Sequence, residues 1–429
     1  MAKKKQELTP EERLAAALVP EEEQPYQLPE GWKWVRLGKI YDVNPKVQAD
    51  DDLEASFITM SDICPGMKSQ FDSSTQKWGE IKRGHTQFAN DDVAFAKISP
   101  CFENRKSMIL DGLKNGIGAG TTELIVLRNS QINNKYTFLF VSSEEFIRRA
   151  RNTYKGVVGQ QRINLDFVKN YPMPLPPRAE QKRIVARIES LFAKLDAAKE
   201  KVQSVLDAHE ARKAALLHEA IMGKFIGTGE REWKPLSEIV DLIRIGPFGS
   251  ALHKEDYIHD GIPVVNPQYI VNQEICPDNR KSISESKADS LSAYKMCVND
   301  IIIGRRGEMG RTAPVGEREA GWLCGTGCML LRLKKEYNAN FYSRVIASQQ
   351  SKQYLEAHAV GSTMKNLNEK IIRNLPVPIY SVSEQQEIAR ILDRLLDREE
   401  KVRQSAELVL ESIDRMKQSI LARAFRGEL

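Results

Sequence analysis

Apolar residues recur every three or four positions in two long stretches of the chain, residues 180–222 and 384–429. This alternation has a mean repeat of about 3.5 residues, which is typical of the contact line between helices in a coiled coil. Two ordinary amphipathic helices, each packed on its own domain, are the alternative. Neither stretch contains glycine or proline before its last residues, so long helices that pair antiparallel are favoured. The predicted contact residues are Ile184, Ile188, Leu191, Leu195 and Val202, then Ile388, Leu392, Leu395, Val402 and Val409.

The two helical stretches belong to a longer internal repeat with an offset of 204 residues. A proline-rich segment precedes each stretch, and each then opens with a Glu-Gln pair, at Glu180 and at Glu384. Shorter similarities lie ahead of these helices, such as Asp91–Lys97 with Asn299–Arg305. A constant long offset indicates a duplicated module.

The repeat divides the chain into two mixed globular domains, each followed by a long helix. The predicted fold class is α+β, with two globular domains of mixed helix and strand joined by two long antiparallel coiled-coil helices. The predicted boundaries are an N-terminal extension (1–30), domain 1 (31–177), a central helix (178–226), domain 2 (227–380) and a C-terminal helix (381–429).

The proline-rich entries, the repeated Glu-Gln motif and the helix ends at Phe225 and Leu429 resemble the specificity subunit of type I restriction-modification enzymes. The resemblance covers about residues 31–429. It implies a DNA-recognition subunit in which each globular domain reads one half of a bipartite target. It further implies that the helices set the spacer and dock two methyltransferase subunits, with two motor/nuclease subunits completing the complex.

The same resemblance implies that the subunit itself is not catalytic and holds no cofactor. S-adenosylmethionine, ATP and Mg²⁺ are expected on the partner subunits, and the methylated base would be adenine. The sequence agrees, since it lacks a Gly-x-x-x-x-Gly-Lys phosphate loop and the tetrapeptide of amino-methyltransferases. Cys324 and Cys328 are spaced one residue too widely for a Cys-x-x-Cys zinc knuckle, so no metal site is predicted.

Composition adds little to this picture. The net charge of +5 over 429 residues points only weakly to nucleic acid. No apolar run is long enough for a membrane span, and six cysteines without a secretion signal indicate a reduced, cytoplasmic protein. Thr9-Pro-Glu-Glu12 is a capping box that predicts a short helix over residues 10–18, either a partner-binding helix or part of a disordered tail.

Basic and amide residues cluster around the glycine-containing segment 155–162 and after the apolar runs that end near Phe95 and Ile303. Lysine and arginine neutralise phosphates, while arginine and glutamine also read base edges in the major groove. A solvated helix face over residues 144–151 is the alternative, and it is favoured for Arg148. The predicted DNA-binding residues are Lys97, Asn104, Arg105, Lys106, Lys155, Gln160, Gln161, Arg162, Arg305, Arg306, Arg311, Lys365 and Asn366.

A protein-only helical scaffold without DNA specificity is the alternative function. The two halves share their anchor segments but differ between them, and a symmetric scaffold gains nothing from two unlike surfaces. Sequence-dependent retention on DNA distinguishes the two functions.

Overall fold

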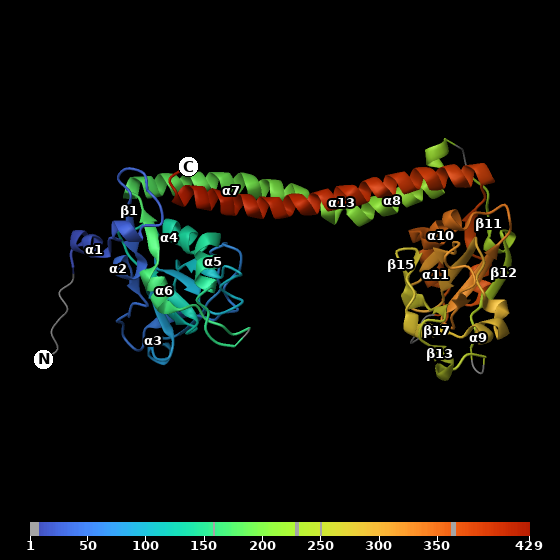
Figure 1. Cartoon of the computed structure of the whole chain (residues 1–429), viewed down its shortest axis with the longest axis horizontal. Coiled ribbons are helices and arrows are strands. Elements are labelled where there is room, and N and C mark those ends of the chain that lie inside the picture. The colour runs from blue at the N-terminus through green and yellow to red at the C-terminus, as the bar shows by residue number, and fades with distance from the viewer. Residues whose placement is uncertain (1–7, 158, 228–230, 249–250, 362–365) are drawn as a thin grey trace. The chain divides into compact units, whose positions relative to one another are not determined.

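The computed structural model describes residues 8–429 except 158, 228–230, 249–250 and 362–365. Its contacts fall into two compact units, shown together in Figure 1 and described separately below. Unit 1 comprises Met1–Val202 and Leu408–Leu429, and unit 2 comprises Gln203–Glu407. No helix among the described residues is long and apolar enough to cross a membrane.

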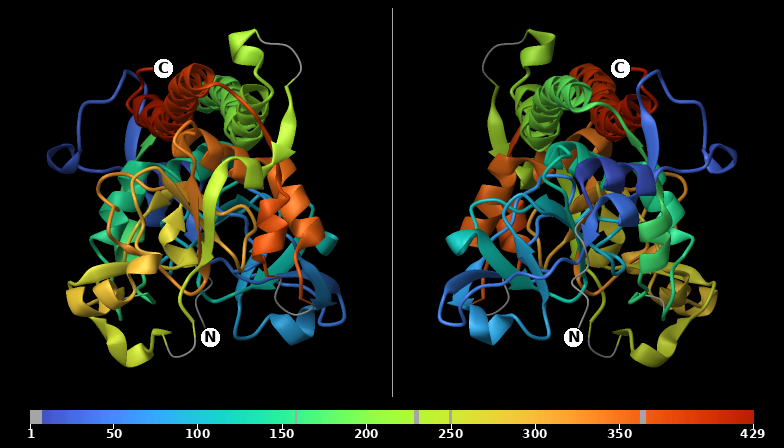
Figure 2. Two further views of the ribbon diagram at one scale, coloured as in Figure 1. Left: turned by 90° about the vertical axis from the view of Figure 1, so that its right-hand side faces the viewer. Right: turned by 90° about the vertical axis from the view of Figure 1, so that its left-hand side faces the viewer.

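The helices predicted from the apolar repeat are α7 (Arg178–Asp207), α8 (His209–Ile221) and α13 (Val382–Phe425). In unit 1, α7 runs antiparallel to the end of α13, because Asp196 pairs with Lys417 at 2.5 Å and Lys199 with Asp414 at 3.2 Å. In unit 2, α8 runs antiparallel to the beginning of α13, with Arg212 paired to Glu399 at 2.8 Å. Each helix pair lies along one side of its globular part (Figures 1 and 2). The predicted antiparallel pairing is confirmed within each unit.

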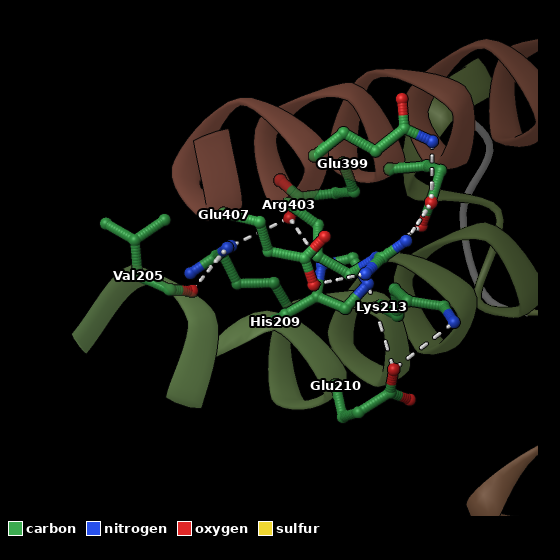
Figure 3. A network of polar contacts seen from close by, with 10 residues as sticks. Val205, His209, Glu210, Lys213, Glu399, Arg403 and Glu407 are labelled. Atoms are coloured by element: carbon green, nitrogen blue, oxygen red, sulfur yellow. Dashed lines mark hydrogen bonds and ion pairs between the residues drawn. The ribbon is translucent and has the colours of Figure 1, made fainter. Parts of the chain in front are cut away.

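The predicted central helix is formed by α7 and α8, with an irregularity at Ala208, whose backbone keeps helical angles. His209 starts α8 and is buried between two carboxylates, with Nδ1 3.7 Å from Glu399 and Nε2 3.7 Å from Glu210 (Figure 3). Its Nδ1 atom has no hydrogen-bond partner among the described residues. An imidazole thus takes the place where the apolar repeat predicts a hydrophobic contact.

Two predicted contact residues of α13, Val402 and Val409, are at the surface with 43% and 44% of their area exposed. Arg403, beside Glu407, and Leu410 are partly buried in their place (Figure 3), whereas Ala406 and Ile413, which belong to the same apolar repeat, are buried. A straight α-helix drifts by about 20° in every heptad relative to a strict 3.5-residue repeat. The buried face has therefore moved by one residue at these two places. Ile184, Ile188, Ile388 and Leu392 are buried as predicted, and Leu191, Leu195, Val202 and Leu395 are partly exposed.

The described residues of unit 1 form ten strands in three small sheets, with orders β1-β10, β2-β9-β6-β7 and β4-β3-β8-β5. β3 and β8 pair in parallel, and the other neighbours pair antiparallel. The strands are β1 (Lys33–Arg36), β2 (Asp42–Val43), β3 (Glu54–Ile58), β4 (Ser74–Lys77), β5 (Thr86–Ala89), β6 (Val93–Ala96), β7 (Ser107–Ile109), β8 (Ile117–Gly120), β9 (Leu124–Arg128) and β10 (Pro172–Leu175). The helices before α7 are α1 (Pro10–Ala17), α2 (Leu37–Ile40), α3 (Trp78–Ile81), α4 (Asn134–Val141), α5 (Glu144–Arg151) and α6 (Leu165–Asn170).

Unit 2 repeats this arrangement in β11-β22, β12-β21-β18-β19 and the parallel pair β14-β20. The remaining pairs are β13-β17, β14-β17 and the hairpin β15-β16. The strands are β11 (Trp233–Pro235), β12 (Val240–Ile245), β13 (Tyr257–Ile258), β14 (Ile262–Val265), β15 (Ile270–Val271), β16 (Glu274–Ile275), β17 (Ser282–Ile283), β18 (Asp300–Gly304), β19 (Thr312–Pro314), β20 (Leu323–Cys324), β21 (Cys328–Leu333) and β22 (Pro376–Pro378). The helices are α8, α9 (Glu285–Ser290), α10 (Ala339–Ala347), α11 (Gln349–His358), α12 (Glu369–Arg373) and the first part of α13.

Buried polar pairs repeat in the two units and explain why the Glu-Gln motif recurs. Gln181 accepts a hydrogen bond from the backbone N–H of Asn133 at 2.9 Å, and Gln385 accepts one from Asn338 at 2.7 Å. Each glutamine thereby ties the start of the long helix to the residue that caps α4 or α10. The predicted mixed fold with a duplicated framework is confirmed.

The N-terminal helix α1 carries the predicted capping box, in which the backbone N–H of Glu12 donates to Thr9 Oγ1 at 3.2 Å. Ala17 is fully buried in the core of unit 1, and Leu14 packs against that core. The described part of the extension also reaches the end of α13, since the Tyr26 hydroxyl donates to the carbonyl of Phe425 at 3.1 Å. The helix thus packs on its own unit, and residues 1–7 lie outside the described part of the chain.

Candidate nucleic-acid interface

In unit 1, the loops that follow β3, β6 and β8 meet a hairpin formed by residues 155–162. Backbone hydrogen bonds join them: the Lys97 N–H donates to Glu123 O at 2.8 Å, and the Ile163 N–H donates to Lys97 O at 3.0 Å. The Lys106 ammonium donates to the carbonyl of Met60 at 2.6 Å and ties in the loop after β3. Since β3 and β8 are parallel, their C-terminal ends open at the same edge of the sheet. The tertiary structure thus brings three separate loops and one hairpin into a single edge.

The hairpin is closed by two backbone hydrogen bonds between Lys155 and Arg162, at 3.0 and 2.9 Å. Gly156 and Gly159 have φ of 111° and 87°, a region that only glycine adopts readily, so the turn requires them. Val157 at the tip is 81% exposed. The hairpin is therefore exposed at its tip and carries basic residues at its base.

Arg162 is fixed at this edge by Glu123, which the sequence did not suggest as a site residue. The guanidinium Nε donates to Glu123 Oε2 at 2.9 Å and Nη2 donates to Oε1 at 2.8 Å, while Nη1 donates to Gln160 O at 3.1 Å. The hydrogen bond from Arg162 lowers the pKa of the Glu123 carboxyl, with a further electrostatic contribution from Lys97. The pair is 39 residues apart in the chain, and no local sequence signal marks it.

The other predicted residues of unit 1 divide into two groups. Arg105 binds the carbonyl of Ser142 at 3.1 Å and the carboxylate of Glu144, and therefore supports the loop rather than facing solvent. Lys106 is engaged with Met60, as described above. The second group, Lys97, Asn104, Lys155, Gln160 and Gln161, has partly or fully exposed side chains on the loop edge. Their contacts with DNA remain a prediction.

Unit 2 builds an equivalent edge with different side chains. The Arg305 N–H donates to Gly327 O at 2.9 Å, and the Leu367 N–H donates to Arg305 O at 2.9 Å. Two backbone hydrogen bonds join Val360 and Asn366, at 3.1 and 2.8 Å, at the place that matches Lys155 and Arg162. Arg305, Gly327 and Asn366 therefore correspond to Lys97, Glu123 and Arg162. Lys365, also a predicted residue, lies outside the described part of the chain.

Two arginines at the edge of unit 2 have no carboxylate partner among the residues that the structure describes. Arg305 Nε donates to Asn366 Oδ1 at 3.1 Å, and Arg306 is exposed beside it. Burial, together with the charge of Arg306, lowers the pKa of the Arg305 guanidinium. A phosphate would relieve this uncompensated charge. Arg311, in contrast, is neutralised by Glu308 at 3.0 Å and also donates to Pro267 O at 3.1 Å.

The other candidate chemistry in the sequence has a structural role. Cys324 and Cys328 lie in a buried core cluster, and burial raises the pKa of the Cys324 thiol to about 12. A thiol that stays protonated is a poor metal ligand or nucleophile. Among the described residues, no cluster of three or more His, Cys, Asp or Glu side chains is arranged to hold a metal ion.

Comparison with known proteins accounts for the duplicated architecture. The family model of the type I restriction modification DNA specificity domain matches residues 29–206 and again residues 230–409. The Escherichia coli type I restriction enzyme EcoEI specificity subunit is 38% identical over 228 residues, which are 52% of this chain and 38% of that protein. The EcoAI specificity subunit of Escherichia coli is 40% identical over 228 residues, 52% of this chain and 39% of that protein. The match thus spans less than two fifths of either relative.

Solved structures share the fold at lower sequence identity. The HsdS subunit from Thermoanaerobacter tengcongensis has a TM-score of 0.68 and 19% identity, covering 95% of this chain and 100% of that one. A chain from a structure concerned with complex assembly and conformational transition of the type I R-M system has a TM-score of 0.69 and 21% identity, covering 94% and 100%. Because the family model matches twice and accounts for most of the chain, this protein belongs to the family of type I restriction-modification DNA specificity subunits.

Proposed function

We propose that the chain is the sequence-specific DNA-recognition subunit of a type I restriction-modification complex and reads a bipartite target. Each loop edge would read one half of that target. The observation that carries this proposal is the repeated edge itself: the backbone hydrogen bonds of Lys97 and Arg305 are equivalent, but the side chains around them differ. A common scaffold with two unlike reading surfaces fits a double-stranded target with two unlike halves.

In this proposal the subunit is not catalytic. Two methyltransferase subunits would methylate adenine, and two motor/nuclease subunits would cut DNA. S-adenosylmethionine, ATP and Mg²⁺ would bind to those partners, and the complex would act in the cytoplasm. The family of the chain supports this division of labour.

The long helices would dock the methyltransferase subunits and set the unread spacer between the two halves. Three apolar residues on the part of α13 in unit 1 support docking, since Leu408, Val409 and Met416 are 60%, 44% and 52% exposed. Exposed apolar side chains gathered on one helix favour a protein partner.

The spacer role is tested by adding seven residues after Val202 and seven after Ala406. The insertions lengthen each helix by about 10 Å, at 1.5 Å per residue. The unread spacer should then grow by about three base pairs, each of about 3.4 Å. A variant that methylates DNA with the original spacer length would contradict this role.

Methylome sequencing of a host that carries this chain with its methyltransferase partner tests the recognition function. One bipartite motif should be methylated, and it should disappear when this chain is removed. The isolated chain should neither methylate nor cut DNA. If the chain were a protein-only scaffold, the sequence of the methylated motif would not depend on this chain.

A further inference from the structure

The side chain of Glu123 takes no part in the backbone hydrogen bonds that hold its loop in place. Its carbonyl accepts the Lys97 N–H at 2.8 Å, and the carbonyl of Gly327 accepts the Arg305 N–H at 2.9 Å at the equivalent place in unit 2. Glycine at this position therefore accepts the same backbone hydrogen bond as Glu123 does. The Glu123 side chain is used for a different purpose, to hold Arg162 with two nitrogen atoms of the guanidinium.

The ion pair between Arg162 and Glu123 contributes little to the stability of the protein. The side chains of Arg162 and Glu123 are 45% and 22% exposed, and an ion pair at this exposure contributes about 0–1 kcal/mol. The pair does restrict a long and flexible side chain to one orientation. Such an orientation matters where a planar guanidinium must meet a planar partner.

The hydrogen bonds of Arg162 leave a defined pair of donors free. A guanidinium has five N–H donors, and one on Nε, one on Nη2 and one on Nη1 are used by Glu123 and Gln160. One hydrogen remains on each terminal nitrogen, so two donors are left for a further acceptor. Guanine presents the matching acceptors, O6 and N7, side by side in the major groove, and no other base does.

We infer that Glu123 is a specificity-determining residue that positions Arg162 to read a guanine in the half-site recognised by unit 1. The carboxylate also neutralises the guanidinium, and a neutralised guanidinium binds phosphate weakly. Glu123 thus directs Arg162 from the DNA backbone, which carries no sequence information, to a base edge. The inference rests on the proposed DNA-recognition function and names the base class for one position.

The experiment uses the full chain in complex with its methyltransferase partner and measures binding to a library of randomised half-sites. Glu123→Gln keeps the size of the side chain and removes its charge. Arg162→Lys keeps the positive charge and removes the guanidinium. Both variants should lose guanine discrimination at the same single position, by roughly 5- to 150-fold, and keep the other half-site. Glu144→Gln is the matched control, since Glu144 binds Arg105 nearby and should leave the base preference unchanged.

Modified bases test whether Arg162 contacts guanine from the major groove. Replacing the guanine by 7-deazaguanine removes N7 and should weaken binding of the unaltered protein, but not of Arg162→Lys. Inosine keeps O6 and N7 and should bind as guanine does. Thermal unfolding of both variants should match that of the unaltered protein.

The outcomes separate the inference from the function on which it rests. If the unaltered complex shows no sequence preference, the proposed function itself fails. If that complex is specific and Glu123→Gln keeps its full profile, or relaxes every position equally, only the role of Glu123 is overturned.

Discussion

The two loop edges have the same pattern of backbone hydrogen bonds but differ in the partners of their arginines. In unit 1, Arg162 is neutralised by Glu123, and the ion pair raises the pKa of the Arg162 guanidinium. In unit 2, Asn366 occupies the place of Arg162, and the nearby Arg305 is held by an amide oxygen rather than a carboxylate. Burial lowers the pKa of the Arg305 guanidinium. The same backbone thus carries one arginine paired with a carboxylate and another that has no carboxylate partner among the described residues.

The framework beneath the edges differs far less. Asp92 is fully buried and paired with Arg128 at 2.7 Å, and Asp300 is 1% exposed and paired with Arg332 at 2.8 Å. Each aspartate also accepts a backbone N–H, from Ala89 at 2.8 Å or Cys297 at 2.7 Å. Duplication has kept the buried polar groups, which are expensive to lose, and has changed the exposed groups of the loop edges.

The largest test of this comparison is an exchange of residues 31–170 for the corresponding domain of another family member. All reading loops of unit 1 fall inside this range, so one half of the methylated motif should be replaced and the other half should remain. Methylome sequencing of the host reads both halves at once. A reciprocal exchange in unit 2 is the control, and a change of both halves by either exchange would contradict separate reading.

A second test asks whether the buried aspartate–arginine pairs contribute equally to the stability of the two units. Asp92→Ala and Asp300→Ala should each lower the free energy of unfolding by about 3 kcal/mol, because each takes the carboxylate away from an arginine and from a backbone N–H. Urea unfolding measures the change. Glu145→Ala, which removes an exposed pair with Arg149, should change stability by less than about 0.5 kcal/mol. Markedly unequal losses from the two aspartates would show that the frameworks are not equivalent.

A third test concerns phosphate contacts. Removing both Arg305 and Arg306 by substitution with alanine should flatten the salt dependence of DNA binding by up to about two units of slope, since each lost phosphate contact contributes about 0.9. Arg162→Ala should leave the slope almost unchanged, because Glu123 already neutralises that guanidinium. Binding titrations between low and moderate salt give the slopes. If the salt dependence of binding had the same slope in both variants, the proposed difference between the two loop edges would be contradicted.

The smallest effect is expected in the helix pairs, which also differ between the units. His209 is 5% exposed in the helix pair of unit 2, whereas Leu421 and Ala424 fill the pair in unit 1. His209→Leu should raise stability by about 1 kcal/mol, because it removes a buried nitrogen without a hydrogen-bond partner. Thermal unfolding measures the gain. A loss of stability would mean that the contacts of His209 with Glu399 and Glu210 contribute more than an apolar side chain (Figure 3).

The sequence predicted the helices well because their signals are local. The alternation of three and four residues located α7, α8 and α13, and the Thr9–Glu12 capping box located α1. It misplaced Val402 and Val409 because a one-residue drift of the buried face leaves the apolar pattern almost unchanged. It did not indicate the irregularity between α7 and α8 at Ala208, where no glycine or proline lies.

By itself, the sequence determined the duplication, the two mixed domains, the paired helices and the loops that carry basic residues. These depend on composition, periodicity and spacing, which are properties of neighbouring residues. Only the tertiary structure decided which charges meet, because the Arg162–Glu123 pair spans 39 residues and the Arg305–Asn366 pair spans 61. Such pairs form where loops from different strands end at a common edge. Their geometry depends on the packing of whole sheets, which no short stretch of sequence records.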